Sequence, residues 1–139
     1  MKIKVIGTLS LLLFICFILS CENEQSIEFK RYYSEGAIVY QEHCQNCHAA
    51  DGDGLSALIP PLNDSLYLKS NKSSLACYIN FGLKGAITID KRQFEGMMPA
   101  NNLSPMEVAQ VITYITNSFG NKLGLTTVDQ AEADLGKCQ

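Results

Sequence analysis

The sequence has no tryptophan, no block of basic residues, no internal repeat and no low-complexity segment. Its formal net charge is −3, so a nucleic-acid partner is not expected. No window alternates convincingly between apolar and polar residues at period two, and the chain is therefore predicted to be all-α. The longest apolar run, residues 5–19, is shorter than a membrane-spanning helix requires. The 139 residues have an ordinary hydrophobic content and match the size of one domain preceded by a leader.

The leader has the pattern of a secretory signal peptide. Lys2 and Lys4 form a basic start, and the apolar run follows directly. The run ends in Ile18-Leu19-Ser20-Cys21, which resembles the lipobox of bacterial lipoproteins. That resemblance implies that Cys21 becomes the lipidated first residue of the mature chain. An uncleaved N-terminal anchor is the alternative. Both interpretations predict an exported protein that is anchored to a membrane and faces the periplasm or the cell exterior.

Three segments are therefore expected along the chain. They are a lipoprotein signal peptide over residues 1–20, a tether over 21–33 and one domain over 34–139. The tether is polar and lacks a convincing apolar period, which is typical of a short flexible linker. Alternatively, its end packs on the domain through the aromatic side chains of Tyr32 and Tyr33.

Helical signals divide the domain into three predicted helices, over residues 34–47, 73–82 and 104–120. The last has the strongest signals, because Ser104 and Glu107 match a capping box and a proline occupies the first helical position. Its apolar residues recur at helical spacing and form one stripe. That stripe consists of Val108, Val111, Ile112, Ile115 and Phe119.

Two long loops, residues 49–72 and 83–103, connect these helices. Loops of this length are uncommon inside a small domain unless something packs beneath them. A large, flat, apolar cofactor would supply the missing core. A wall for such a cofactor is expected from Leu62, Ile79, Phe81, Ile87, Phe94 and Met97.

The motif that best indicates the chemistry of this protein is C-Q-N-C-H at residues 44–48. A zinc site would usually need four ligands, and no second C-x-x-C pair is present. A thiol–disulfide oxidoreductase would place the pair at a helix start after a strand, whereas here it ends a predicted helix. C-x-x-C-H is the attachment signature of c-type haem. Cys44 and Cys47 would form thioethers with two haem vinyl groups, and His48 would present a ring nitrogen to the iron.

The second axial ligand should come from the other side of the haem. The only other histidine, His43, lies on the same helix as the attachment cysteines and cannot reach that side. Methionine is the natural candidate, and Gly96-Met97-Met98-Pro99 offers two. A thioether sulfur favours ferrous iron and would raise the reduction potential.

An ordered set of motifs resembles the class I monohaem c-type cytochromes. Besides C-x-x-C-H it includes Gly36, Tyr40, Pro60-Pro61-Leu62, Gly82-x-x-Gly85, Gly96-x-Met98-Pro99 and Tyr114. The resemblance covers residues 34–128. It implies an all-α fold in which three to five helices wrap around one covalently attached haem c.

The resemblance also implies roles for individual residues. Met98, directly before a proline, matches the distal iron ligand, and Met97 would be its neighbour in the haem pocket. Pro60 matches the proline whose carbonyl accepts the second ring N–H of the ligand histidine, which fixes the ring. Leu62 would lie against the haem face. Gly36 and Tyr40 would pack across Tyr114, where a missing side chain lets two helices approach closely.

Two of the six cysteines remain after these assignments. Cys16 leaves with the leader, Cys21 takes lipid, and the motif cysteines take haem. Cys77 and Cys138 are left in an oxidising compartment, and a disulfide between them is predicted. The alternative is two unconnected residues, one a small buried hydrophobe and the other a frayed thiol.

The function that follows is single-electron transfer rather than catalysis. With both axial positions filled, no substrate binds the metal, and redox proteins serve as donor and acceptor. Weak docking at an exposed haem edge is expected. The alternatives are a dedicated haem subunit of one dehydrogenase, nitrite reductase or oxidase complex, and a gas- or peroxide-binding haem protein in which the methionine is labile.

Overall fold

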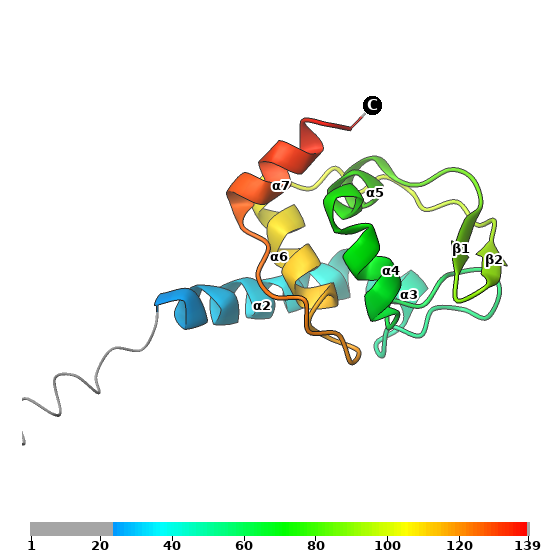
Figure 1. Cartoon of the computed structure of the whole chain (residues 1–139), viewed down its shortest axis with the longest axis horizontal. Coiled ribbons are helices and arrows are strands. Elements are labelled where there is room, and N and C mark those ends of the chain that lie inside the picture. Colours follow the sequence, from blue (N-terminus) through cyan, green and yellow to red (C-terminus); the bar gives the residue numbers. More distant parts are fainter. Residues whose placement is uncertain (1–23, 139) are drawn as a thin grey trace, which may run out of the picture.

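The computed structural model describes residues 24–138. This range contains six α-helices, one 3-10 helix and one two-stranded antiparallel sheet (Figure 1). In chain order they are α2 (Glu24–His43), α3 (Gln45–His48), α4 (Ser65–Ser70), η1 (Lys72–Ser74), α5 (Leu75–Phe81), β1 (Ile87–Ile89), β2 (Arg92–Phe94), α6 (Pro105–Ile115) and α7 (Val128–Leu135). The predicted signal peptide and the lipidation site at Cys21 lie outside the described residues.

The first helix corrects the expected tether. α2 begins at Glu24 and runs unbroken to His43, so the segment 24–33 is helical rather than a flexible linker. Tyr32 is 2% exposed, and the Tyr33 hydroxyl lies 3.0 Å from Ser118 Oγ. The flexible linker was predicted because polar residues dominate this segment. The alternative, that its end packs on the domain through Tyr32 and Tyr33, is confirmed. A 20-residue helix is about 30 Å long, and its N-terminal part projects from the domain in Figure 1.

Helices α2 and α6 cross at Gly36. A Cβ at this position would overlap the Gln110 carbonyl oxygen and would lie 2.9 Å from the Tyr114 Cβ. Tyr40 packs beside the crossing, with its ring centroid 5.2 Å from that of Tyr114. The close approach predicted for Gly36, Tyr40 and Tyr114 is therefore confirmed, and it brings the end of α2 against the core.

The capping box of α6 is also confirmed. Ser104 accepts a hydrogen bond from the Glu107 backbone, and the Glu107 carboxylate accepts one from the Ser104 backbone. The helix ends at Ile115, five residues before the predicted stop at Gly120. Side chains compete for the last carbonyls, because Thr116 Oγ1 donates to Ile112 O at 2.6 Å and Asn117 Nδ2 donates to Thr113 O at 2.7 Å.

Helix α7 follows α6 and was not predicted. It begins with a capping box between Thr127 and Gln130, and it buries Ala131 completely. It lies across α6 and α5 (Figure 1). The two long loops also contain structure: α4 lies in the first, and the hairpin β1–β2 lies in the second, with Ile87 opposite Phe94 and Ile89 opposite Arg92.

The helices pack around one apolar core. The predicted all-α fold is confirmed, although residues 24–138 contain six α-helices rather than the three to five expected. Among residues 24–138, no helix combines the length and the apolar character needed to cross a membrane. The core consists of Tyr32, Val39, Tyr40, Cys44, Leu68, Leu75, Ala76, Ile79, Leu103, Val108, Ala109, Val111, Ile112, Ile115 and Ala131.

Candidate haem site

One large apolar cleft opens between the ends of the helices and the two long loops. It encloses about 1030 Å³ that protein atoms do not fill, including its open mouth. No aspartate, glutamate, lysine or arginine is among the described residues that line it. These are Tyr40, Cys44, Cys47, His48, Leu58, Ile59, Pro60, Pro61, Leu62, Tyr67, Leu68, Leu75, Tyr78, Ile79, Leu83, Ile87, Ile89, Phe94, Gly96, Met97, Met98, Pro99, Val111 and Ile115. An apolar, uncharged lining of this kind suits a flat, largely apolar macrocycle such as haem.

The motif residues stand at one wall of this cleft. Cys44 is the residue before α3, and its carbonyl accepts hydrogen bonds from Cys47 N at 3.1 Å and His48 N at 2.9 Å. One helical turn therefore sets the spacing of the two sulfurs and the imidazole. Cys44 is buried and Cys47 is exposed. Burial, followed by the neighbouring Cys47, raises the pKa of the unreacted Cys44 thiol to about 11, so a neutral sulfur faces the apolar cleft.

The orientation of His48 is fixed by a backbone carbonyl. His48 Nδ1 lies 3.1 Å from Pro60 O, and the residue is 9% exposed. A carbonyl oxygen can only accept, so Nδ1 carries the proton and Nε2 keeps its lone pair. Burial lowers the pKa of His48, and the Pro60 carbonyl opposes this effect only in part. A neutral imidazole with a free Nε2 is the form that binds a metal.

Tyr40 supports the same turn. Its hydroxyl donates a 2.6 Å hydrogen bond to Ala49 O, directly after the histidine. Burial is the main cause that raises the pKa of Tyr40, so the phenol stays protonated and remains a donor. The residue thus packs the helix crossing and fixes the end of α3, which is a structural role.

The two candidate methionines differ in their surroundings. Met98 is half-buried, lines the cleft and forms a two-bond bridge with Leu83, with Met98 N to Leu83 O and Leu83 N to Met98 O both at 3.0 Å. Met97 is 72% exposed and borders the cleft only at its mouth. The structure therefore brings Met98 and His48 into one cavity and leaves Met97 largely in solvent.

The expected wall is largely present. Leu62, Ile79, Ile87 and Phe94 line the cleft, but Phe81 is 58% exposed and does not. Phe81 is the last residue of α5, and its side chain lies largely in solvent.

Two tyrosines in the lining were not predicted. Tyr67 comes from α4 and Tyr78 from α5. Burial, with a smaller contribution from Tyr78, raises the pKa of Tyr67. No motif marks either residue, so the sequence offered no signal for them.

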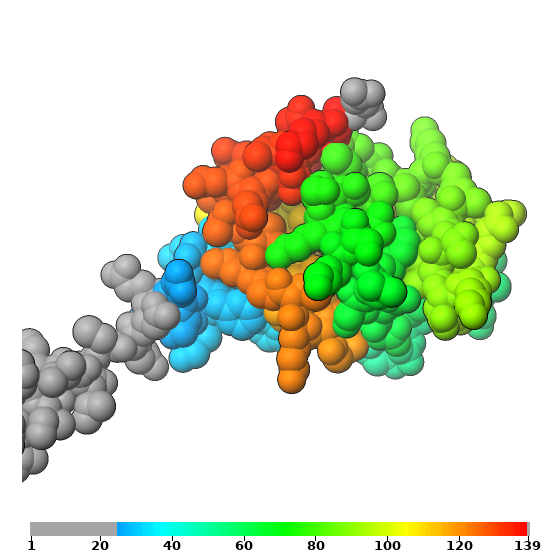
Figure 2. Space-filling model, in the orientation of Figure 1, coloured from blue at the N-terminus to red at the C-terminus, as the bar shows by residue number. Residues whose placement is uncertain are grey.

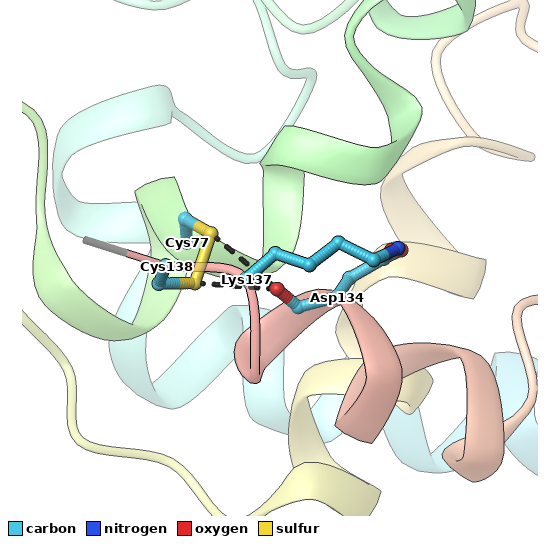
Figure 3. Close-up of a disulfide and its surroundings, with 4 residues drawn as sticks. All are labelled: Cys77, Asp134, Lys137 and Cys138. Atoms are coloured by element: carbon cyan, nitrogen blue, oxygen red, sulfur yellow. Dashed lines mark hydrogen bonds and ion pairs between the residues drawn. A yellow bond between two sulfur atoms is a disulfide. The ribbon is translucent and has the colours of Figure 1, made fainter.

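The last predicted pair, Cys77 and Cys138, is not part of the cleft lining. Cys77 on α5 and Cys138, after the end of α7, are joined by a disulfide with a Cα–Cα distance of 5.5 Å (Figure 3). The bond links residues that are 61 positions apart. Helix α5 carries both Cys77 and the lining residue Ile79.

A helical domain with one uncharged cleft beside a C-x-x-C-H turn defines an electron-transfer protein that holds a covalent haem. Comparisons with known proteins agree. The cytochrome c family model matches residues 33–118, and the chain belongs to the cytochrome c family. Proteins of this family bind haem c covalently and carry electrons, and haem c is accordingly the cofactor of this chain.

The similar proteins are of two kinds, a cytochrome c-552 and a subunit of a dehydrogenase. The chain is 27% identical over 93 residues to cytochrome c-552 of Thermus thermophilus, a match that covers 63% of this chain and 70% of that protein. It is 32% identical over 90 residues to the cytochrome c subunit of a quinone alcohol dehydrogenase of Gluconobacter oxydans. The second match covers 62% of this chain but only 18% of the subunit. The likeness to that subunit is therefore confined to a fraction of it.

Proposed function

We propose that this protein is a single-electron carrier whose haem iron is held by His48 and Met98. The observation that carries the proposal is the convergence of the buried His48 ring, its Pro60 partner and half-buried Met98 on one uncharged cleft. The haem supplies an iron that changes between ferric and ferrous states. The chain supplies two axial ligands, so neither axial position is left for a substrate. The apolar lining disfavours the more highly charged ferric form and so raises the potential.

Electrons would pass through the mouth of the cleft to redox proteins. Cys47, Met97 and Leu58 are exposed there, and Leu58 and Met97 are 65% and 72% exposed. An apolar rim of this kind suits brief docking of a donor and an acceptor, because transient redox encounters bury little surface. The partners proposed are therefore other redox proteins.

A potentiometric titration followed by optical spectroscopy tests the proposal on the purified holoprotein. We expect a single reversible one-electron transition and, in the ferric protein, a far-red sulfur-to-iron charge-transfer band. A five-coordinate, high-spin ferric spectrum would contradict the proposed ligation, because it would leave the iron without a sulfur ligand.

We also propose that the protein is an exported lipoprotein, anchored through Cys21 and facing the periplasm or the cell exterior. The basic and apolar leader and the lipobox-like sequence support this proposal. Only Glu22 and Asn23 separate Cys21 from the start of α2. The three residue steps from Cys21 to Glu24 span at most about 11 Å, so a lipid on Cys21 would keep the protein beside the membrane and raise its local concentration near membrane-bound partners.

Substitution of the lipidation site tests this anchor. In Cys21→Ala, the holoprotein is expected to move from the membrane fraction to the soluble fraction and to retain its optical spectrum. The measurement is immunodetection and haem staining of fractionated cells. Cys16→Ala, which changes a cysteine in the same leader, is the matched control and should stay with the membrane. Membrane retention of Cys21→Ala would favour an uncleaved leader as the anchor.

The likeness to the alcohol dehydrogenase subunit favours a second candidate function, that of a haem subunit dedicated to one dehydrogenase complex. Co-purification distinguishes the two. A free carrier elutes alone from mildly solubilised membranes, whereas a subunit elutes in stoichiometric amount with a larger protein.

A further inference from the structure

The segment that carries the proposed iron ligand is attached to the end of α5. We call residues 96–102 the Met98 loop. Its backbone is paired with Leu83 through both hydrogen bonds at Met98. Asn101 donates twice to Ile79 O, from its backbone N at 3.3 Å and from Nδ2 at 3.0 Å. Asn102 N donates to Asn80 O at 3.3 Å. These hydrogen bonds make the position of Met98 depend on the position of α5.

Gly82 lets the loop lie directly against the helix end. It follows α5 with a φ of +81°, and a Cβ there would lie 2.5 Å from Met98 O and 3.0 Å from Ala100 N. Backbone packs on backbone at this point, with no side chain between to absorb a displacement. A shift of the end of α5 is therefore transmitted to the loop rather than lost in side-chain rearrangement.

Helix α5 itself is too short to hold its place unaided. It has seven residues, and its N-cap residue, Ser74, makes no capping hydrogen bond. Isolated helices of that length are unstable in water. Its position must therefore come from tertiary contacts, and one of these is covalent. The disulfide joins Cys77 in the middle of α5 to Cys138 beyond α7.

The other end of that bond is firmly placed. α7 buries Ala131 completely against the core, and its surface lies against that of α5 (Figure 2). Both sulfurs contact the Asp134 backbone oxygen, at 3.7 Å from Cys77 Sγ and 3.5 Å from Cys138 Sγ (Figure 3). The exposed Lys137 forms a 2.7 Å ion pair with the Asp134 carboxylate beside the bond.

We propose that the Cys77–Cys138 disulfide is a positioning device for the axial methionine. It fixes α5 to α7, and the end of α5 holds the Met98 loop. The inference rests on the proposed ligation of the iron by Met98. Loss of the bond gives the end of α5 more freedom, so the methionine sulfur leaves the iron more often and an external ligand takes its place more easily.

Imidazole binding to the ferric holoprotein measures how readily the methionine sulfur leaves the iron, because imidazole binds only after the sulfur has left. In the double variant Cys77→Ser/Cys138→Ser, the imidazole affinity is expected to rise about two- to thirtyfold, and the midpoint potential is expected to fall. Lys137→Ala is the matched control. It changes the same surface but leaves the disulfide intact, and its imidazole affinity should equal that of the wild type.

A purely structural disulfide would give a different result. The double variant would then unfold at a lower denaturant concentration, with unchanged imidazole affinity and unchanged potential, and this outcome overturns the proposal. If the double variant does not fold, Asn101→Ala decides, since it removes the Nδ2 bond to Ile79 O with the disulfide in place. Raised imidazole affinity in Asn101→Ala supports the proposal, and wild-type affinity overturns it. A wild-type protein without the far-red band would instead refute the methionine ligation itself.

Discussion

Replacing Met98 with alanine is expected to lower the midpoint potential by on the order of 0.1 V or more, within the roughly 0.8 V range that axial ligands span. The thioether sulfur stabilises ferrous iron, so its loss favours the ferric state. Met98→Ala should also lose the far-red charge-transfer band and bind imidazole without competition. Optical potentiometry and ligand titration of the ferric holoprotein measure these changes.

The neighbouring methionine provides the control for this experiment. Met97→Ala removes the same side chain one residue earlier, but that side chain is 72% exposed and lies at the mouth of the cleft. Its potential is expected to change far less, and its far-red band should persist. The reverse pattern, with the band lost in Met97→Ala and kept in Met98→Ala, would assign the ligand to Met97.

The part of the site closest to the motif could be predicted from sequence because its geometry is local. C-x-x-C-H fixes Cys44, Cys47 and His48 within one helical turn, and the structure places them in that turn. Pro60 is twelve residues beyond His48, and no periodicity connects the two. Its contact with the ring was expected only through the resemblance to known cytochromes.

The position of Met98 in the cleft could not be predicted from its neighbours in the sequence. Met98 reaches the cleft because the backbone at Leu83 pairs with it, and Leu83 had no signal of its own in the sequence. Pairing between separated loop residues depends on the tertiary fold. The preference for Met98 over Met97 as the proposed ligand therefore comes from the resemblance, and the structure adds that Met98 is the less exposed of the two.

The errors in the fold have two different causes. α4 and α7 carry readable capping signals, since Asp64 caps the first and Thr127 with Gln130 caps the second. These capping residues are visible in the sequence and are sufficient to predict the start of both helices. The hairpin was harder to predict, because its turn at Asp90 and Lys91 has positive φ at both residues without a glycine. The polar composition of residues 24–33 gave no sign of a helix. This segment is held to the domain by tertiary contacts of Tyr32 and Tyr33, which the local sequence does not predict.

Gly36→Ala is expected to destabilise the fold by roughly 2 kcal/mol or more, at the upper part of the range for overpacked sites. Alanine favours a helix over glycine by about 1 kcal/mol, so helix propensity alone predicts the opposite sign. The added Cβ meets the Gln110 carbonyl oxygen, which is part of the α6 backbone and cannot turn aside. The helices must separate, and the Tyr40–Tyr114 contact loosens with them. Guanidinium unfolding of the holoprotein, followed by far-ultraviolet circular dichroism, measures the change.

Gly136→Ala makes the same substitution where the structure has room. Gly136 has φ −64° and ψ −13°, and a Cβ there would meet only ordinary contacts, the nearest at 3.5 Å from Glu132 O. With a compatible backbone, alanine is expected to stabilise the protein by about 0.4–1 kcal/mol, because the unfolded chain loses freedom. The two alanine variants should thus shift the unfolding midpoint in opposite directions. Equal shifts would mean that α2 and α6 are not in backbone contact at Gly36. In that case the crossing with α6 would not fix the end of α2, from which the chain continues directly into the haem attachment turn.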